Sequence, residues 1–172
     1  MRTPKFTLAI LCLLAAAAAS RAPGQGIPPA VQAPADQRLY LQLHAAGDQI
    51  YVCKSESAQF SWTLKAPEAE LRDLDGKAFG KHFAGPTWQS NDGSSVTGTV
   101  TAKAESGDPD AIPWLLLNVT GHQGDGILSR AKTVQRIHTK GGKPPGGGCD
   151  AGHLNQELRV PYSADYNFYA AK

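Results

Sequence analysis

Beyond residue 36, apolar and polar side chains alternate along the chain with a period of two, which is typical of β-strands that bury one face. The alternation is clearest in residues 96–104, where valine, glycine and alanine take turns with threonine and lysine. The same period recurs in residues 39–44, 49–53 and 59–64. The pattern predicts an extended backbone in each of these stretches.

Further strands are expected where apolar or aromatic residues lie between turn-forming residues. These strands cover residues 112–120, 133–139 and 162–169. Short turns are expected at residues 46–48, 55–57 and 107–110, which are rich in Gly, Asp and Ser.

One segment, residues 67–74, has two interpretations. Pro67 is followed by acidic residues and could begin a short helix. The Asp-Gly pair at residues 75–76 instead favours a hairpin turn with a strand on either side. We prefer the hairpin.

Together these elements predict an all-β protein, a single-domain antiparallel β-sandwich or barrel of about 8–9 short strands. Residues 37–172 form the predicted β-domain. A chain of roughly 150 residues is long enough to build one domain with a proper hydrophobic core.

The first 22 residues have the pattern of a signal peptide, with Arg2 and Lys5, an apolar run over residues 6–19 and then small residues. That run of about 14 residues is shorter than the roughly 20 that span a bilayer, and a retained N-terminal anchor is the alternative. Residues 23–36, rich in Pro, Gly, Ala and Gln, are expected to be a flexible leader. We therefore expect a secreted or periplasmic protein, with no membrane attachment after cleavage.

The charge balance argues against nucleic acids as partners. The sequence has 17 Lys and Arg residues and 15 Asp and Glu residues, a net charge of +2. Three of the basic residues and none of the acidic ones lie in the signal segment, which leaves a net charge of −1 on the exported chain. There is no basic cluster either, so we expect no nucleic-acid partner. We also expect the protein to be a monomer.

Two cysteines, Cys53 and Cys149, remain after the signal segment. An isolated pair in an oxidising compartment is most simply a disulfide, and it would close a loop of about 97 residues. Two free thiols or a pair of metal ligands are the alternatives. Neither cysteine has a CxxC partner, so a zinc site has no support.

Most of the candidate chemistry lies in residues 79–95, where a Gly-Pro pair and an Asp-Gly pair predict turns on either side of Trp88. Trp88 either closes one end of the core or forms a binding surface. His82 is either a buried structural histidine or a ligand or base, and Asp92 either caps its own turn or acts as an acid. We take His82, Trp88 and Asp92 as the candidate ligand-binding residues.

No catalytic or cofactor motif accompanies these residues. The chain has no GxSxG, HExxH, P-loop or EF-hand pattern, and residues 121–126 lack the dinucleotide fingerprint. The five histidines are scattered, and none lies within four residues of another. We therefore expect no metal site and no cofactor.

Six segments in order resemble the domain of unknown function 3455 family, whose members are secreted proteins of bacteria and fungi. The segments are QIYVC (49–53), WTLKAPEAEL (62–71), GKHFAGPTWQSNDGSSV (80–96), IPWLLL (112–117), VQRIHTKGGKPPGGGCD (134–150) and VPYSADYNFY (160–169). The resemblance covers residues 35–169 and implies no particular activity. The family's motif includes both cysteines and the residues His82, Gly85, Pro86, Trp88, Asp92 and Gly93. Some fungal relatives carry a malate dehydrogenase label, which the missing nucleotide fingerprint and α/β pattern do not support.

Two functions remain open. The first is a non-catalytic binding module for a small molecule or carbohydrate, with Trp88 and its neighbours as the binding surface. The second is a hydrolase or lyase that uses His82 and Asp92 as acid and base. We favour the binding module because the sequence shows no nucleophile and no pair of acids.

Overall fold

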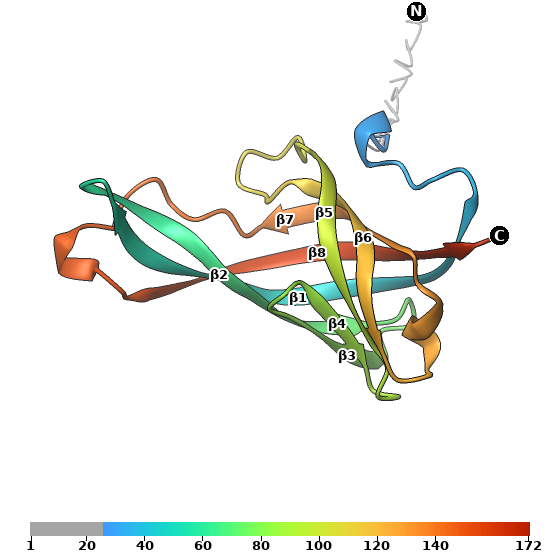
Figure 1. Cartoon of the computed structure of the whole chain (residues 1–172). Helices are drawn as coiled ribbons and strands as arrows, with labels where there is room; N and C mark the ends of the chain where they lie inside the picture. The colour runs from blue at the N-terminus through green and yellow to red at the C-terminus, as the bar shows by residue number, and fades with distance from the viewer. Residues whose placement is uncertain (1–25) are drawn as a thin grey trace, which may run out of the picture.

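A computed structural model describes residues 26–172, and the predicted signal peptide lies outside them. The described chain is built from strands joined by short loops (Figure 1). The strands are β1 (Gln37–Glu56), β2 (Gln59–Arg72), β3 (Ala78–Phe83), β4 (Thr87–Ser90), β5 (Ser95–Ala104), β6 (Trp114–Gln123), β7 (Thr133–Gly141) and β8 (Glu157–Ala171). Three short 3₁₀-helices lie between or before them: η1 (Pro29–Val31), η2 (Ile127–Arg130) and η3 (Ala151–His153).

Each strand pairs antiparallel with the next one in sequence, and β8 pairs with β1 to close the sheet into a barrel. The prediction of an all-β antiparallel domain is confirmed. Closure decides between the two architectures that the alternation left open, because a sheet without free edges is a barrel and not a sandwich.

The turn predicted at residues 46–48 is wrong, because β1 runs straight through it. Gly47 pairs with Ala69 of β2 on one side and with Tyr162 of β8 on the other. A Cβ atom at Gly47 would lie 2.1 Å from the carbonyl oxygen of Glu68. The glycine therefore lets two strands approach closely. From the sequence alone, a glycine with this role cannot be distinguished from a glycine that forms a turn.

Two other predicted turns are found. The turn expected at residues 55–57 lies at Ser57 and Ala58, which join β1 to β2 with positive φ angles of 49° and 63°. The hairpin interpretation of residues 67–76 is confirmed, since β2 continues to Arg72 and Gly76 turns the chain with φ 80°.

The β1–β2 hairpin extends beyond the barrel as a twisted ribbon (Figure 1). β2 pairs with β3 only from Ala69 to Arg72, so the earlier part of β2 has β1 as its only partner strand. The barrel wall is consequently incomplete on that side of β2. This gap in pairing lies beside the cavity described below.

The inside of the barrel holds the main hydrophobic core. Leu43, Leu71, Leu117, Val134 and Phe168 are all buried there. Along β1 the inward side chains change from Leu43 and Ala45 to the polar Gln49 and then Tyr51. One end of the barrel is thus filled by aliphatic and aromatic side chains, and the other end is lined in part by polar ones.

A second, smaller core lies under η1 and joins the N-terminal segment to the barrel. Val31 is fully buried there with Trp114 and Ile137. The carbonyl oxygen of Val31 accepts a hydrogen bond of 2.6 Å from Nε2 of the buried Gln135. Part of residues 23–36, which the sequence predicts to be a flexible leader, thus contacts the domain through Ile27 and Val31.

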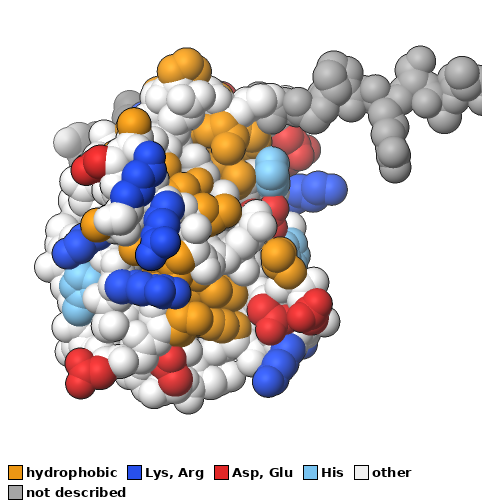
Figure 2. Space-filling model, turned by 90° about the vertical axis from the view of Figure 1, so that its right-hand side faces the viewer, with side chains coloured by type: hydrophobic (Ala, Val, Ile, Leu, Met, Phe, Trp, Pro, Cys, Tyr) orange, Lys and Arg blue, Asp and Glu red, His pale blue; other side chains and the backbone are white. Residues whose placement is uncertain are grey.

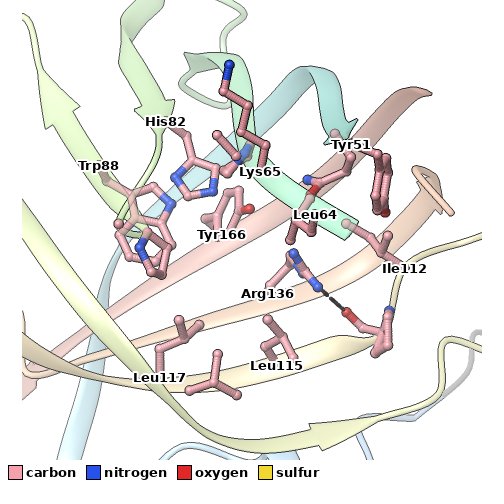
Figure 3. Close-up of a pocket in the computed structure, with 17 residues that line it drawn as sticks. Tyr51, Leu64, Lys65, His82, Trp88, Ile112, Leu115, Leu117, Arg136 and Tyr166 are labelled. Carbon is pink, nitrogen blue, oxygen red and sulfur yellow. Dashed lines mark hydrogen bonds between the residues drawn. The ribbon is translucent and has the colours of Figure 1, made fainter. Parts of the chain in front are cut away.

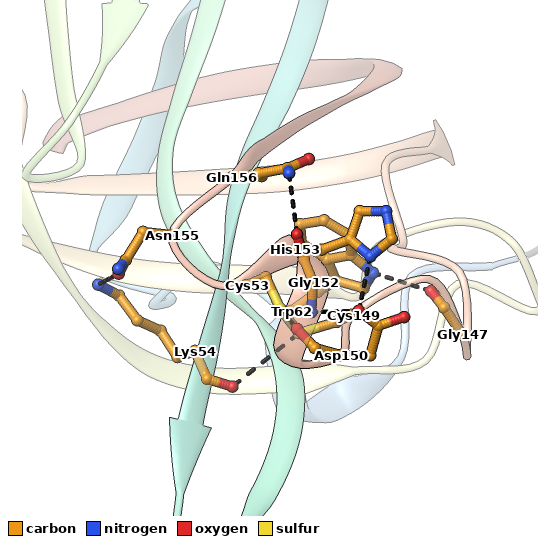
Figure 4. Close-up of a disulfide and its surroundings, with 10 residues drawn as sticks. All are labelled: Cys53, Lys54, Trp62, Gly147, Cys149, Asp150, Gly152, His153, Asn155 and Gln156. Atoms are coloured by element: carbon orange, nitrogen blue, oxygen red, sulfur yellow. Dashed lines mark hydrogen bonds and ion pairs between the residues drawn. A yellow bond between two sulfur atoms is a disulfide. The ribbon is translucent and has the colours of Figure 1, made fainter.

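The predicted disulfide between Cys53 and Cys149 is confirmed, with the two Cα atoms 5.3 Å apart. It attaches the glycine- and proline-rich loop that follows β7 to the outer part of β1 (Figure 4). Trp62 of β2 supports the same loop, because its Nε1 donates a 2.9 Å hydrogen bond to the carbonyl oxygen of Gly147. A disulfide of this kind is typical of proteins that fold in an oxidising compartment.

Within residues 26–172, no helix has the length and apolar character needed to cross a membrane.

Candidate functional site

A cavity of about 400 Å³ lies inside the barrel, and we call it the barrel cavity. All eight strands contribute to its wall. Its lining includes Gln49, Tyr51, Leu64, His82, Trp88, Val100, Ile112, Leu115, Leu117, Arg136 and Tyr166 (Figure 3). Leu64 and Val100 are about half exposed, at 52% and 47%, and they mark where the cavity opens to solvent.

On the face shown in Figure 2, several Lys and Arg side chains lie near one another on the left, and hydrophobic side chains are exposed beside them. Lys, Arg, Asp and Glu side chains all occur on that face, with hydrophobic side chains exposed between them. Across residues 26–172, the large exposed hydrophobic side chains are scattered through the sequence: Leu39, Phe60, Leu64, Leu74, Val100, Ile127 and Leu154. The cavity is therefore the better candidate for a site.

The β3–β4 hairpin places His82 and Trp88 together in the cavity wall. The two residues are direct partners in the sheet register, and Gly85 turns the chain between them with φ 104°. Their rings stack with centroids 4.6 Å apart and planes 12° apart. The indole is only 1% exposed and also contacts Tyr166 and Phe168 edge to face. Trp88 is thus a buried wall residue and does not form an exposed platform.

His82 is held in one protonation state by its surroundings. Its Nδ1 lies 2.8 Å from the carbonyl oxygen of Thr87, so Nδ1 carries the proton and donates it. Burial lowers the pKa of His82 to about 3, although the bond to Thr87 acts in the opposite direction. The imidazole is therefore neutral near pH 7, with Nε2 free of a proton.

Asp92 does not join His82 and Trp88. It lies in the β4–β5 turn, where its carboxylate accepts hydrogen bonds from Ser94 N at 2.8 Å, Ser94 Oγ at 2.6 Å and Ile127 N at 2.8 Å. These bonds lower the pKa of Asp92 to about 2. Asp92 is absent from the cavity lining and forms no hydrogen bond with His82. Its observed contacts tie the turn to the start of η2.

The Tyr162 hydroxyl lies close to Gln49 and Tyr166, and Arg136 lies close to Tyr166. Three buried polar atoms in the cavity wall nevertheless form no hydrogen bond of normal geometry with the described residues. They are Gln49 Nε2, Trp88 Nε1 and Tyr166 Oη. Buried polar atoms are nearly always paired in folded proteins, so these three require partners that water or another bound molecule would supply. Burial raises the pKa of Tyr166, so its hydroxyl stays protonated and able to donate.

Arg136 is the charged residue of the inner wall. Its Nε and Nη2 both donate to the carbonyl oxygen of Pro113, at 3.1 Å and 2.8 Å. The ion pairs found among residues 26–172 all involve other side chains. Lys65, at the rim of the cavity, is instead paired with Glu157.

Sequence reasoning found two of these wall residues, His82 and Trp88, and missed Gln49, Arg136 and Tyr166. One signal for Arg136 was present. Arg136 lies two residues after the inward-facing Val134 on the same strand, so its charged side chain occupies a position where the alternation predicts an apolar one.

In the part of the chain that the structure describes, no three His, Cys, Asp or Glu side chains come together in a way that could hold a metal ion. No curated protein and no solved structure matches the chain. A family model does match, over residues 34–170, and it agrees with the resemblance seen in the six sequence segments. The chain belongs to the family described as protein of unknown function (DUF3455).

Proposed function

We propose that this protein is a non-catalytic binding module that holds a small, largely apolar molecule inside its barrel. Eight-stranded barrels have an interior just wide enough either to be filled by side chains or to hold one small ligand. In this barrel the side chains leave about 400 Å³ unfilled, within the usual range for ligand pockets.

The observation that carries the proposal is the set of three buried polar atoms, none with a hydrogen bond of normal geometry, in a largely apolar wall. Gln49, Trp88 and Tyr166 come from three different strands and line one cavity. A few convergent polar groups in a concave apolar surface are what fixes the orientation of a small ligand.

The size of the cavity limits the ligand. Because one water molecule occupies about 30 Å³ in the liquid, a cavity of about 400 Å³ suits a molecule of roughly a dozen non-hydrogen atoms. Carbohydrate is the weaker candidate, since sugar rings stack on open aromatic faces and the face of Trp88 is covered by His82.

Binding is favoured over hydrolase or lyase chemistry by the positions of the candidate acid and base. His82 and Asp92 do not contact each other, and each already has partners of its own. With its pKa at about 3, His82 is also a weak base near neutral pH.

We also propose that the protein works after export, in the periplasm or outside the cell. Support comes from the signal-peptide pattern of residues 1–22 and from the disulfide between Cys53 and Cys149.

The test is calorimetric screening of small apolar compounds against the wild-type protein and two variants of β5. Val100→Trp places a large side chain in the mouth of the cavity, whereas Thr99→Trp adds the same side chain on the opposite face of the same strand. We expect wild type and Thr99→Trp to bind the same compounds, and Val100→Trp to lose at least about tenfold in affinity, about 1.4 kcal/mol.

Equal binding by all three folded proteins would place the ligand elsewhere and contradict the proposal. Failure of every compound of suitable size to bind wild type would contradict it as well. Thermal unfolding of each variant establishes that it is folded under the conditions of the titration.

A further inference from the structure

We propose that the ligand of the barrel cavity carries a carboxylate group and that Arg136 binds it. The inference rests on the proposed function and adds the chemical class of the ligand. It starts from a cation that points into an apolar space.

The guanidinium of Arg136 is held in place but only partly satisfied. A single carbonyl oxygen, that of Pro113, accepts from both Nε and Nη2 (Figure 3). Arginine has five N–H donors in a planar fork. The other three, which include both hydrogens of Nη1, form no hydrogen bond to a carbonyl or carboxylate oxygen among residues 26–172, and the Tyr166 hydroxyl lies beside the guanidinium. The free edge of the fork has the geometry that matches a carboxylate with two parallel hydrogen bonds.

The charge of Arg136 is also not neutralised by the described part of the protein. No Asp or Glu lines the cavity. The other cation of the cavity lining, Lys65, already has Glu157 as its partner. A positive charge in a partly enclosed, apolar site is stabilised strongly by an anion and poorly by a neutral molecule.

Two neighbouring donors would complete the anion site. Tyr166 is the direct cross-strand partner of Arg136, and its hydroxyl lies close to Arg136 and Tyr162 without a hydrogen bond of normal geometry to either. Gln49 Nε2, which also lacks such a bond, belongs to the same cavity wall. The protein therefore presents a cation and two neutral donors, but no carboxylate, to the head group of a ligand.

The remainder of the wall determines the other end of the ligand. Leu64, Val100, Ile112, Leu115 and Leu117 provide an apolar surface without charge. A single cation surrounded by aliphatic side chains suits a monoanion with a hydrocarbon body. A medium-chain fatty acid or an arylalkenoic acid has this chemistry, and a sugar phosphate does not.

The experiment compares carboxylates with their uncharged amides, which have the same shape. Octanoate with octanamide and cinnamate with cinnamamide are titrated into the exported protein by calorimetry at low salt and pH 7. We expect each carboxylate to bind at least about tenfold more tightly than its amide, as charge-assisted bonds to arginine are the stronger kind.

The variant Arg136→Gln should remove that preference, and Arg136→Lys should keep part of it. Arg38→Gln is the matched control, because it makes the same change at an exposed arginine outside the cavity. Since His82 remains neutral, the affinity of wild type for the carboxylates should stay constant between about pH 5.5 and 8.

The outcomes separate this inference from the proposed function. If an amide binds as tightly as its carboxylate, the barrel binds ligands but the assignment of the head group is overturned. If neither the carboxylate nor the amide of either pair binds, both the proposed function and the assignment of the head group fail. The comparison in wild type does not require the Arg136 variants to fold. If they do fold, an unchanged preference in Arg136→Gln would also overturn the assignment.

Discussion

At the scale of single residues, the stack of His82 on Trp88 joins the core to the barrel cavity. One ring is a neutral imidazole and the other is an indole with an unpartnered N–H. Both are almost fully buried, at 2% and 1% exposure. Their contribution to stability can be measured separately from any contribution to binding.

Replacing Trp88 with alanine should lower the free energy of unfolding by about 3–5 kcal/mol, because the change leaves a large void beside Tyr166 and Phe168. Urea denaturation measures the change. Trp62→Ala is the control, since Trp62 is partly exposed and should lose only its hydrogen bond to Gly147, about 1 kcal/mol. Equal losses in the two variants would mean that Trp88 is not a core residue.

His82 should make the protein less stable in acid. In the unfolded chain its pKa is near 6.5, and in the folded protein it is about 3. Below about pH 6.5 the unfolded state therefore binds a proton that the folded state does not. The free energy of unfolding should fall as the pH drops toward 3, with a slope approaching 1.4 kcal/mol per pH unit from this residue.

The variant His82→Gln should lack that part of the slope, whatever its stability at pH 7. Denaturation by urea at several pH values from about 4 to 7 measures it, and the exposed His153→Gln serves as the control. A slope in His82→Gln as steep as in wild type would show that this buried histidine is not the group responsible.

At the scale of elements, the loop between β7 and β8 is tied to the barrel at several places. The disulfide joins it to β1, and the hydroxyl of Tyr51, in the cavity wall, donates a 2.6 Å hydrogen bond to the carbonyl oxygen of Gly142. A loop with this many glycines and prolines has little regular structure of its own. Its order comes from these attachments.

Cys149→Ser should lower the free energy of unfolding by about 2–5 kcal/mol, the usual effect of losing a native disulfide. Wild type treated with a reductant should approach the stability of the variant. Hydrogen exchange should increase mainly in residues 143–150, near the lost attachment. An oxidised wild type that is no more stable than Cys149→Ser would contradict a stabilising role of the bond.

At the scale of the whole molecule, the strands form a barrel closed by β1 and β8, and η1 packs outside it. The C-terminus of the chain lies beside the start of β1. The amide of Lys172 donates to the carbonyl oxygen of Asp36, and Val31 fills a pocket formed by Trp114 and Ile137. The segment before β1 thereby covers the outer face of β6 and β7.

Val31→Ala should cost about 1.5–3 kcal/mol, from two buried carbon atoms at about 0.8 kcal/mol each and the cavity left behind. Gln32→Ala, at the exposed next position, should change stability by less than about 0.5 kcal/mol. Chemical denaturation compares the two. A Val31→Ala variant as stable as Gln32→Ala would mean that this segment does not contribute to the folded domain.

The sequence by itself determined the class of fold and most of the strands, because the side-chain alternation of a half-buried strand is a local property. It also indicated the disulfide, since only two cysteines follow the signal segment. The turn at residues 46–48 was predicted wrongly for a tertiary reason. Gly47 is a turn former in isolation, but pairing with strands on both sides keeps it extended.

Only the tertiary structure decided that the sheet closes, that Ile27 and Val31 pack on the barrel, and that a cavity remains. Each of these depends on contacts between residues far apart in the sequence, which no local pattern encodes. The same is true of the candidate site. Gln49, Arg136 and Tyr166 lie on β1, β7 and β8, and only the antiparallel register around the closed barrel brings them to one wall.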